Sequence, residues 1–267
     1  MSARATPRDV SVLEIGGVDY RGLATQASVA INHQTADSRP ISRKYANPQA
    51  VKSSWVLNMT SNIVKSGAAT VTNLDLTGTS ILGTAYVADV ESLQFNVACA
   101  HVPGDACQDG WAYPVYDSSD ITGTATLKVP TGSVQIMAGQ DAPGDADGVF
   151  TFTLNGNTVT LPVILTSIDH SMVNGSVQTV TVSFQGQDPR TGNMPTAPTG
   201  TTTIVEKILN APETALAVEV ESKAVGGVNY TGNVLISAYG LSINNGAVVS
   251  ETFTWTGVGA PTTAATV

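Results

Sequence analysis

The chain has 267 residues, of which 12% are charged and 42% are hydrophobic, and its formal net charge is −9. This length can bury the core of one large domain or two small ones, and so few charges are typical of β-sandwiches, barrels or subunits of an assembly. The acidic charge argues against nucleic-acid binding as the main function, because it would repel phosphate.

The charges are distributed unevenly along the chain. Residues 1–65 hold eight Lys and Arg against four acids, whereas residues 66–267 hold four against seventeen. A basic front and an acidic remainder can attract copies of the same chain head to tail, or they can simply solvate the surface. The first ten residues lack the apolar segment of a signal peptide, and no apolar run approaches the roughly 18 residues of a membrane span. We therefore expect a soluble, cytosolic product with Cys99 and Cys107 reduced rather than bridged.

In chain order, the first segments read as an arm, two strands and a loop. Residues 1–9 are expected to form a flexible arm, and Val10–Asn32 contains two strand-like runs. His33–Val51 is polar and basic and contains two prolines. A loop of this length is usually functional or ordered by a partner.

The next segments favour strands as well. Trp55, Leu57 and Met59 alternate within Ser54–Val64, which predicts a strand with these side chains on one face. Ala88–Ala100 fits either a strand or a helical turn, since its apolar residues match both spacings.

The second half of the chain adds hairpins and a linker. Residues 149–161 predict a hairpin that turns at Asn155-Gly156. Arg190–Thr203 is rich in Pro, Gly and Thr and is the best candidate for a linker. Ile204–Leu209 can begin a short helix, whereas Ala215–Val220 fits strand or helix equally well.

One hairpin pattern is written twice. The segment from Val163 to Pro189 recurs near the end of the chain, and each copy contains an apolar run, an Asn-Gly step and an alternating run closed by glycine. The Asn-Gly steps at positions 174–175 and 245–246 predict tight hairpin turns, which need positive φ at both central residues. The side chains expected in the core are Val180, Val182 and Phe184 in the first copy, aligned with Glu251, Phe253 and Trp255 in the second.

A shorter echo links the front of the chain to its back. The phrase GGVDYRG at Gly16–Gly22 returns as GGVNYTG at Gly226–Gly232. It reflects either a repeat or shared turn chemistry, because so short a Gly-rich phrase specifies little else.

The residues that carry most enzyme chemistry do not cluster in the sequence. The three histidines are far apart, and no nucleotide-binding loop, nucleophile elbow or dinucleotide fingerprint is present. The acidic turn at residues 141–148 lacks the spacing of a calcium loop. Asp169, His170 and Ser171 are adjacent on a predicted strand, so they point to alternate faces and cannot work in series. We expect no enzyme activity, cofactor or metal.

Two regions carry a resemblance to a known family. Leu235–Gly259 reads LISAYGLSINNGAVVSETFTWTGVG, and Leu165–Gly186 is a looser copy of it. At the front, an early strand at Ala24–Asn32 is followed by a long polar loop and a Trp-bearing strand at Trp55–Val64. This combination resembles the tail tube (major tail) proteins of long-tailed bacteriophages.

The resemblance implies an all-β sandwich or barrel, with at most one short helix, that assembles into rings. Stacked rings form the virion tail tube, through which DNA passes without specific binding. The implied partners are copies of the chain, in hexameric rings or in trimers if each chain holds two modules, and other tail proteins, all made in the bacterial cytoplasm. We expect Arg39, Arg43 and Lys44 to contact a neighbouring subunit.

The expected domain plan has four parts: an arm at residues 1–9, a tube-like sandwich at 10–189, a linker at 190–203 and a second β lobe at 204–267, which either stands apart or belongs to one continuous domain. Two other readings stay open. A carbohydrate-binding or adhesive β-sandwich would use Trp111, Tyr113 and Tyr116 as a stacking platform. The second is another virion component with the same fold, such as a capsid decoration protein.

Overall fold

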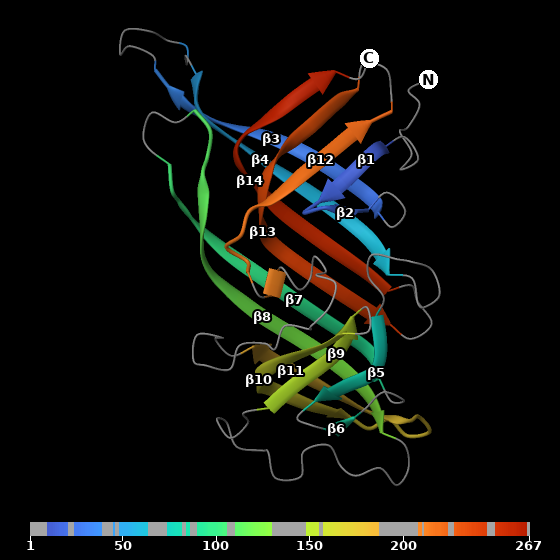
Figure 1. Cartoon of the computed structure of the whole chain (residues 1–267). Coiled ribbons are helices and arrows are strands. Elements are labelled where there is room, and N and C mark those ends of the chain that lie inside the picture. The colour runs from blue at the N-terminus through green and yellow to red at the C-terminus, as the bar shows by residue number, and fades with distance from the viewer. Residues whose placement is uncertain are drawn as a thin grey trace.

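The chain forms one antiparallel sheet of fourteen strands in a computed structural model (Figure 1). The structure describes residues 10–20, 24–38, 45, 48–63, 74–81, 84–85, 90–105, 110–129, 148–154, 157–186, 208–209, 211–223, 227–244 and 249–265. The strands are β1 (Val10–Ile15), β2 (Val18–Asp19), β3 (Ala24–Asp37), β4 (Pro48–Ile63), β5 (Leu74–Ile81), β6 (Thr84–Ala85), β7 (Val90–Pro103), β8 (Pro114–Val129), β9 (Gly148–Leu154), β10 (Asn157–Ser171), β11 (Gln178–Gly186), β12 (Leu216–Ser222), β13 (Val228–Asn244) and β14 (Val249–Ala265).

The prediction of an all-β fold is confirmed. Helical geometry in the described part is confined to residues 208–209, and the sheet does not close on itself. Among the described residues, no helix has the length and apolar character needed to cross a membrane. The alternating residues Trp55, Leu57 and Met59 are buried as expected, at 2% exposure or less.

The strands follow one path with a branch. The order is β2-β1-β12-β13-β7-β8-β11-β10-β9-β5-β6, and β14, β4 and β3 continue from the other side of β13. Bulges between Thr231 and Asn233 and between Ile236 and Ala238 bend β13, since a bulge kinks the strand that carries it. The bend lets β12 and β1 fold over β14 and β4, which places Tyr20 edge-on against Phe253 with ring centroids 5.9 Å apart.

The strand pairing reveals two copies of one unit. β1 to β4 are repeated by β5 to β8, because Ile15 pairs with both Val18 and Val218 while Ile81 pairs with both Thr84 and Phe150. β9 to β11 are repeated by β12 to β14 in the same way. We call β1 to β4 with β12 to β14 the outer unit, and β5 to β11 the inner unit.

The inner unit is therefore inserted within the outer one. Figure 1 shows the outer unit in the upper part of the view and β5, β9, β10 and β11 in the lower part, with β7 and β8 running between them. The expected linker at residues 190–203 lies outside the described residues, and β12 to β14 complete the sheet that β1 to β4 begin.

The predicted repeat of the closing hairpin is seen in β10–β11 and β13–β14. Leu165 faces Phe184 as Ile236 faces Trp255, and both hairpins carry a bulge at the next residue. The tight turn predicted for the first hairpin is wrong, since β10 and β11 are joined by a longer loop, Met172–Val177. Gly175 does supply a positive φ there, of 83°. Asn245-Gly246 lies outside the described residues.

The strand bounds also bear on three other expectations. The loop predicted at His33–Val51 is shorter, because β3 extends to Asp37 and β4 begins at Pro48. The ends of these two strands are polar on both faces, so the sequence shows no alternation of apolar and polar residues there. The strands are held together by backbone pairing. The ambiguous segments near Ala88–Ala100 and Ala215–Val220 are the strands β7 and β12. The described parts of the two GGVDYRG copies each lie where one strand turns into its antiparallel neighbour, at β1–β2 and at β12–β13, which agrees with shared turn chemistry.

Candidate functional site

The two units meet at a junction between β7 of the inner unit and β13 of the outer unit. The two strands pair antiparallel without interruption, from Ser92 opposite Asn244 to Ala98 opposite Ala238. Their core-facing side chains are Leu93, Phe95 and Val97 from β7 and Tyr239, Leu241 and Ile243 from β13. All six are buried, and the rings of Phe95 and Tyr239 meet edge-on at 6.3 Å.

A second contact reinforces this junction. The turn between β7 and β8 lies against the outer unit, where the backbone N–H of Ser53 donates to Gly110 O at 2.9 Å and that of Ala112 donates to Ser53 O at 2.8 Å. Gly259 at the end of β14 donates to Ala112 O at 2.9 Å. Lys52 and Asp105 form an ion pair across the same contact. The junction thus combines strand pairing with a docked turn.

Among the described strands, the equivalents of the two joined strands have no such partner. β3 is the counterpart of β7, and among the described strands it pairs only with β4. β10 is the counterpart of β13, and from Ile164 onward its described pairing is with β11 only. We call these the β3 edge and the β10 edge. An unpaired edge presents backbone N–H and C=O groups that another chain can bind.

Five of the six side chains at the equivalent edge positions are apolar, and the sixth is His170. Ala27, Val29 and Ile31 of β3 stand at the positions of Leu93, Phe95 and Val97. Ile168, His170 and Met172 stand at the positions of Tyr239, Leu241 and Ile243. Ile31 is 37% exposed and Met172 is 76% exposed, whereas their counterparts Val97 and Ile243 are buried. The edges therefore keep the pattern of the junction without its burial.

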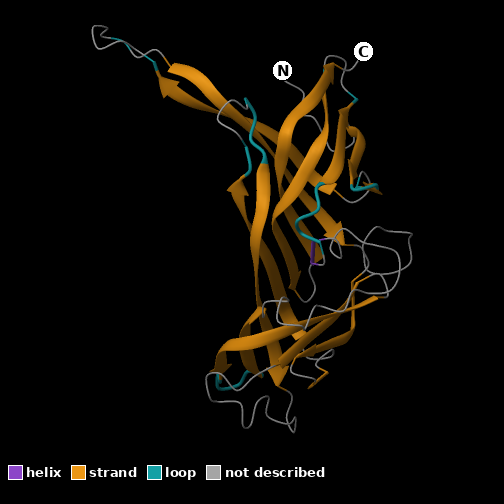
Figure 2. Ribbon diagram, turned by 60° about the vertical axis from the view of Figure 1, so that its left-hand side comes forward, coloured by secondary structure: helices purple, strands orange, loops and turns teal. Residues whose placement is uncertain are grey.

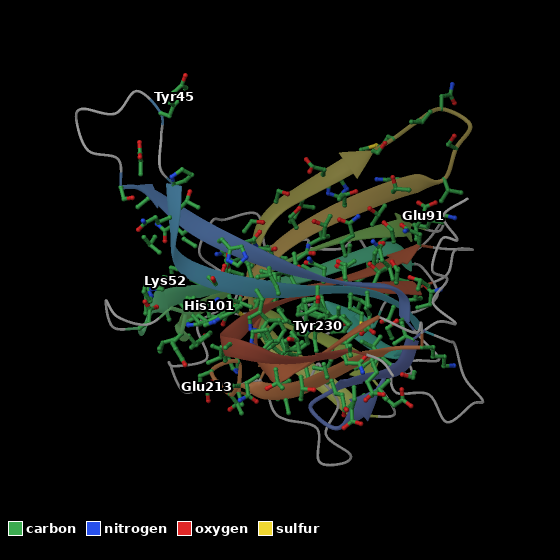
Figure 3. The ribbon with its side chains drawn as sticks, turned by 90° about the horizontal axis from the view of Figure 1, so that it is seen from above. Tyr45, Lys52, Glu91, His101, Glu213 and Tyr230 are labelled. Atoms are coloured by element: carbon green, nitrogen blue, oxygen red, sulfur yellow. The ribbon has the colours of Figure 1, made fainter. Side chains whose placement is uncertain are left out.

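The edges lie on different sides of the molecule. Figure 3 shows the β3–β4 ribbon ending near Tyr45 on one side and the β10–β11 hairpin projecting on the other. Figure 2 shows the far end of the β3–β4 ribbon extending beyond the rest of the sheet. Two edges placed this way cannot satisfy one another within a single chain.

Tyr45 occupies the turn between β3 and β4 and is 85% exposed. It is the counterpart of Trp111, because the alignment that places Ile31 on Val97 also places Tyr45 on Trp111. Trp111 is half-buried where the turn between β7 and β8 docks on the outer unit. The predicted contact residues Arg39, Arg43 and Lys44 share this turn but lie outside the described residues. In sequence, the first two stand at the positions of Asp105 and Asp109.

A buried acid distinguishes the outer unit. Glu251 is 1% exposed and accepts hydrogen bonds from Tyr239 Oη at 2.9 Å and Ser61 Oγ at 3.1 Å. Burial raises its pKa to about 7, although the two hydrogen bonds act in the opposite direction. The inner unit has Val180, Ile168 and Leu127 at the three equivalent positions, so this polar group is not required by the fold.

Replacing Glu251 by Gln is expected to remove a pH dependence of stability. The folded pKa of about 7 lies above the ordinary value of 4.5, so the native state binds the extra proton between these values. The unfolding free energy therefore falls as pH rises from about 4.5 to 7, by ~1.4 kcal/mol for each pH unit and about 3 kcal/mol in all. Urea unfolding of both proteins at pH 5 and pH 8 measures the difference. An equal slope in the Gln variant would contradict the assignment.

A small cavity lies where the docked turn meets the outer unit. Its volume is about 340 Å³, and Lys52, Ser54, His101 and Pro114 are among the residues that line it. Figure 3 shows Lys52 and His101 close together at this place. Burial lowers the pKa of His101, which a hydrogen bond to the backbone of Ile236 partly opposes. The lining mixes aliphatic groups with polar and charged ones, including the ion pair of Lys52 and Asp105.

The other candidate sites do not come together. Of the three aromatic residues, Tyr113 is 44% exposed, Trp111 is half-buried at the junction, and Tyr116 donates to Ser119 Oγ at 3.0 Å. Asp169, His170 and Ser171 are consecutive residues of β10. Within the described part, no cluster of potential metal ligands is present. The acidic turn at 141–148 lies outside it, apart from Gly148.

Cys99 is a free thiol at the half-buried end of β7, and burial raises its pKa to about 11. It is therefore a poor nucleophile at neutral pH, since the thiolate is the reactive form. Cys107 lies outside the described residues.

The sequence was also compared with known proteins. No family model and no curated protein matches it. The two unpaired edges, with the filled junction that corresponds to them, remain the feature that points to a function.

Proposed function

We propose that the chain is a structural subunit that polymerises into the tail tube of a bacteriophage virion, a conduit for DNA. The observation that carries the proposal is the pair of unpaired edges, each equivalent to a strand that is paired at the internal junction. One edge of each kind per chain makes a head-to-tail interface, which yields a ring if the rotation closes.

The repeat supports a particular ring size. The resemblance to tail tube proteins implies six modules in a ring, and each chain contains two related units. Three copies then supply six units. The charges support head-to-tail assembly, in which the outer unit of one copy meets the inner unit of the next. The inner unit spans residues 74–186 and has eleven acids and one basic residue, whereas residues 1–65 are basic.

Electron microscopy of the concentrated, purified chain tests this function. We expect rings with a central hole and stacks of such rings at high protein concentration. A monodisperse monomer at every concentration would exclude a tube. Binding of the monomer to a glycan array, with no assembly, would instead favour the carbohydrate-binding alternative.

Replacing Arg39, Arg43 and Lys44 together by Ser is expected to weaken assembly at low salt. The loss of three positive charges near an acidic neighbour reduces both the association rate and the affinity. Light scattering in low-salt and high-salt buffers measures it: the difference from wild type should be large in the first buffer and small in the second, because salt screens exposed charges. Unchanged assembly in both would remove these residues from the interface.

A further inference from the structure

The internal junction specifies how two copies of the chain would pair, residue by residue. The β7–β13 pairing joins an inner unit to an outer unit, and the corresponding strands of the opposite units are β3 and β10. The equivalence extends to irregularities. β3–β4 has register shifts after Ala24 and Gln34, and β7–β8 has them at the equivalent positions, after Val90 and Ala100. The two units therefore present the same backbone to a partner.

We propose that the β3 edge of one copy pairs antiparallel with the β10 edge of a second copy in the register of the internal junction. Placing β3 on β7, with Ile31 at Val97, and β10 on β13, with Ile168 at Tyr239, gives the pairs between copies. Ile31 then lies opposite Ile168, as Val97 lies opposite Tyr239. This inference rests on the proposed self-assembly and adds the identity of both strands and their alignment.

The side chains agree with this register on both faces of the sheet. On the core-facing side, Ala27, Val29 and Ile31 of one copy meet Ile168, His170 and Met172 of the other, which covers the exposed Ile31 and Met172. On the opposite side, Ala30 lies opposite Asp169 and Ser28 opposite Ser171, so no like charges face one another. A register shifted by one residue would put Asp169 on the apolar side, because successive side chains alternate between faces.

The turn between β3 and β4 has a place in the same geometry. At the junction, Trp111 forms a parallel bridge with Ser53 of β4. The equivalent contact between copies joins Tyr45 to Ser119 of β8, and it would cover a ring that is 85% exposed in the single chain. Asp117 and Asp120 flank that position on β8.

The charges of the two turns match their different neighbours. The acidic turn at the junction meets Lys52, whereas the turn of β3–β4 is basic and would meet the acids of β8. Because the two turns carry opposite charges, a turn that docked on the wrong unit would face like charges, which disfavours that pairing.

Cysteine cross-linking between different copies tests the register. In a background with Cys99→Ala and Cys107→Ala, copies carrying Ser28→Cys are mixed with copies carrying Ser171→Cys, then oxidised or treated with a short bismaleimide. Directly opposed residues have Cβ atoms about 5 Å apart, within reach of both treatments. We expect a covalent dimer in the mixture and none from either variant alone.

A matched control uses Ser167→Cys in place of Ser171→Cys. Position 167 lies further along the same strand and on the same face, about 13 Å from the opposed position, so its yield should be at least tenfold lower. Equal yields in the two mixtures would overturn the register. A dimer from Ser28→Cys copies alone would overturn the head-to-tail pairing, because it requires β3 to meet β3.

The outcomes also separate the register from the proposed function. A chain carrying both Ser28→Cys and Ser171→Cys should give a covalent ladder that stops at one size, the closed ring. A ladder with no rings or tubes under the microscope supports the pairing and argues against the tube. Rings that form without this cross-link support self-assembly but overturn the pairing.

Discussion

Ile31→Lys is expected to leave the chain folded and to prevent its assembly. Ile31 is 37% exposed in the single chain, so a lysine there can extend into water at little cost to folding. In the proposed interface the same ammonium faces Ile168 of the next copy, where its charge loses water and gains no partner. We expect at least a 100-fold weaker association, measured by sedimentation velocity, with an unchanged urea midpoint.

Ala30→Lys is the matched control for that variant. It adds the same side chain one residue away, on the opposite face of β3, where Asp169 of the neighbouring copy lies opposite it. Assembly should persist or strengthen. If Ala30→Lys and Ile31→Lys reduced assembly equally, the assignment of the two faces would be wrong.

The Ile31→Lys variant should also interfere with wild-type copies. Its β10 edge is intact, so it can occupy the β3 edge of a wild-type chain but cannot accept a further copy. Small amounts added to wild-type protein should therefore reduce ring formation by more than dilution does. A heterologous interface has this property, whereas a two-fold symmetric one would simply exclude the variant.

Gly257→Ala is expected to have the largest effect on folding. A methyl group at this position would overlap the indole of Trp55, which is buried at 1% exposure and donates from Nε1 to Gly259 O at 2.9 Å. The indole cannot move away without losing that hydrogen bond and opening the core. Overpacking typically costs about 1–3 kcal/mol and sometimes more, and we expect at least about 3 kcal/mol here. Urea unfolding followed by tryptophan fluorescence measures it.

Two further variants isolate the cause. Gly110→Ala is the control, since a methyl group there meets nothing within 4 Å and should change stability by less than ~0.5 kcal/mol. Adding Trp55→Leu to Gly257→Ala should recover part of the loss, because the smaller side chain makes room. Strictly additive effects of the two substitutions would show that the indole is not the obstacle.

Glycine at this position also follows from the repeat. Gly186, the counterpart of Gly257, faces Ile121, the counterpart of Trp55, and a methyl group there would lie 2.7 Å from the Ile121 Cβ. Both hairpins therefore close on a glycine because a bulky side chain of the neighbouring strand covers the backbone.

Alternation and local repeats were enough to predict much of the fold. The pattern of Val180, Val182 and Phe184 predicted their burial, and all three are at 1% exposure or less. The repeated hairpin was visible because both copies keep the same turn and closing residues. Glu251 was expected on the buried face from its place in the alternation, although its residue type argues against burial.

The larger repeat was not found from the sequence. IGGVDY at residues 15–20 and ILGTAY at residues 81–86 stand at equivalent places in the two units, but they share few residues and the strands before them differ in polarity. What the two units have in common is backbone pairing, including bulges, which many sequences can satisfy. The candidate edges were missed for a related reason, since an edge is defined by the absence of a neighbouring strand. The short GGVDYRG echo reflects turn chemistry and not this larger repeat.

The insertion of one unit within the other affects the order in which the chain can fold on the ribosome. β1 to β4 are synthesised first, but the outer unit cannot be completed until β12 to β14 are made, since Val10 pairs with Ser222. All strands of the inner unit are made in between and can pair at once. Until β13 emerges, β7 lacks the neighbour that finally covers it, and a nascent chain close by could supply its own β13. Crowded synthesis should therefore yield exchanged dimers, whereas dilution during refolding should suppress them.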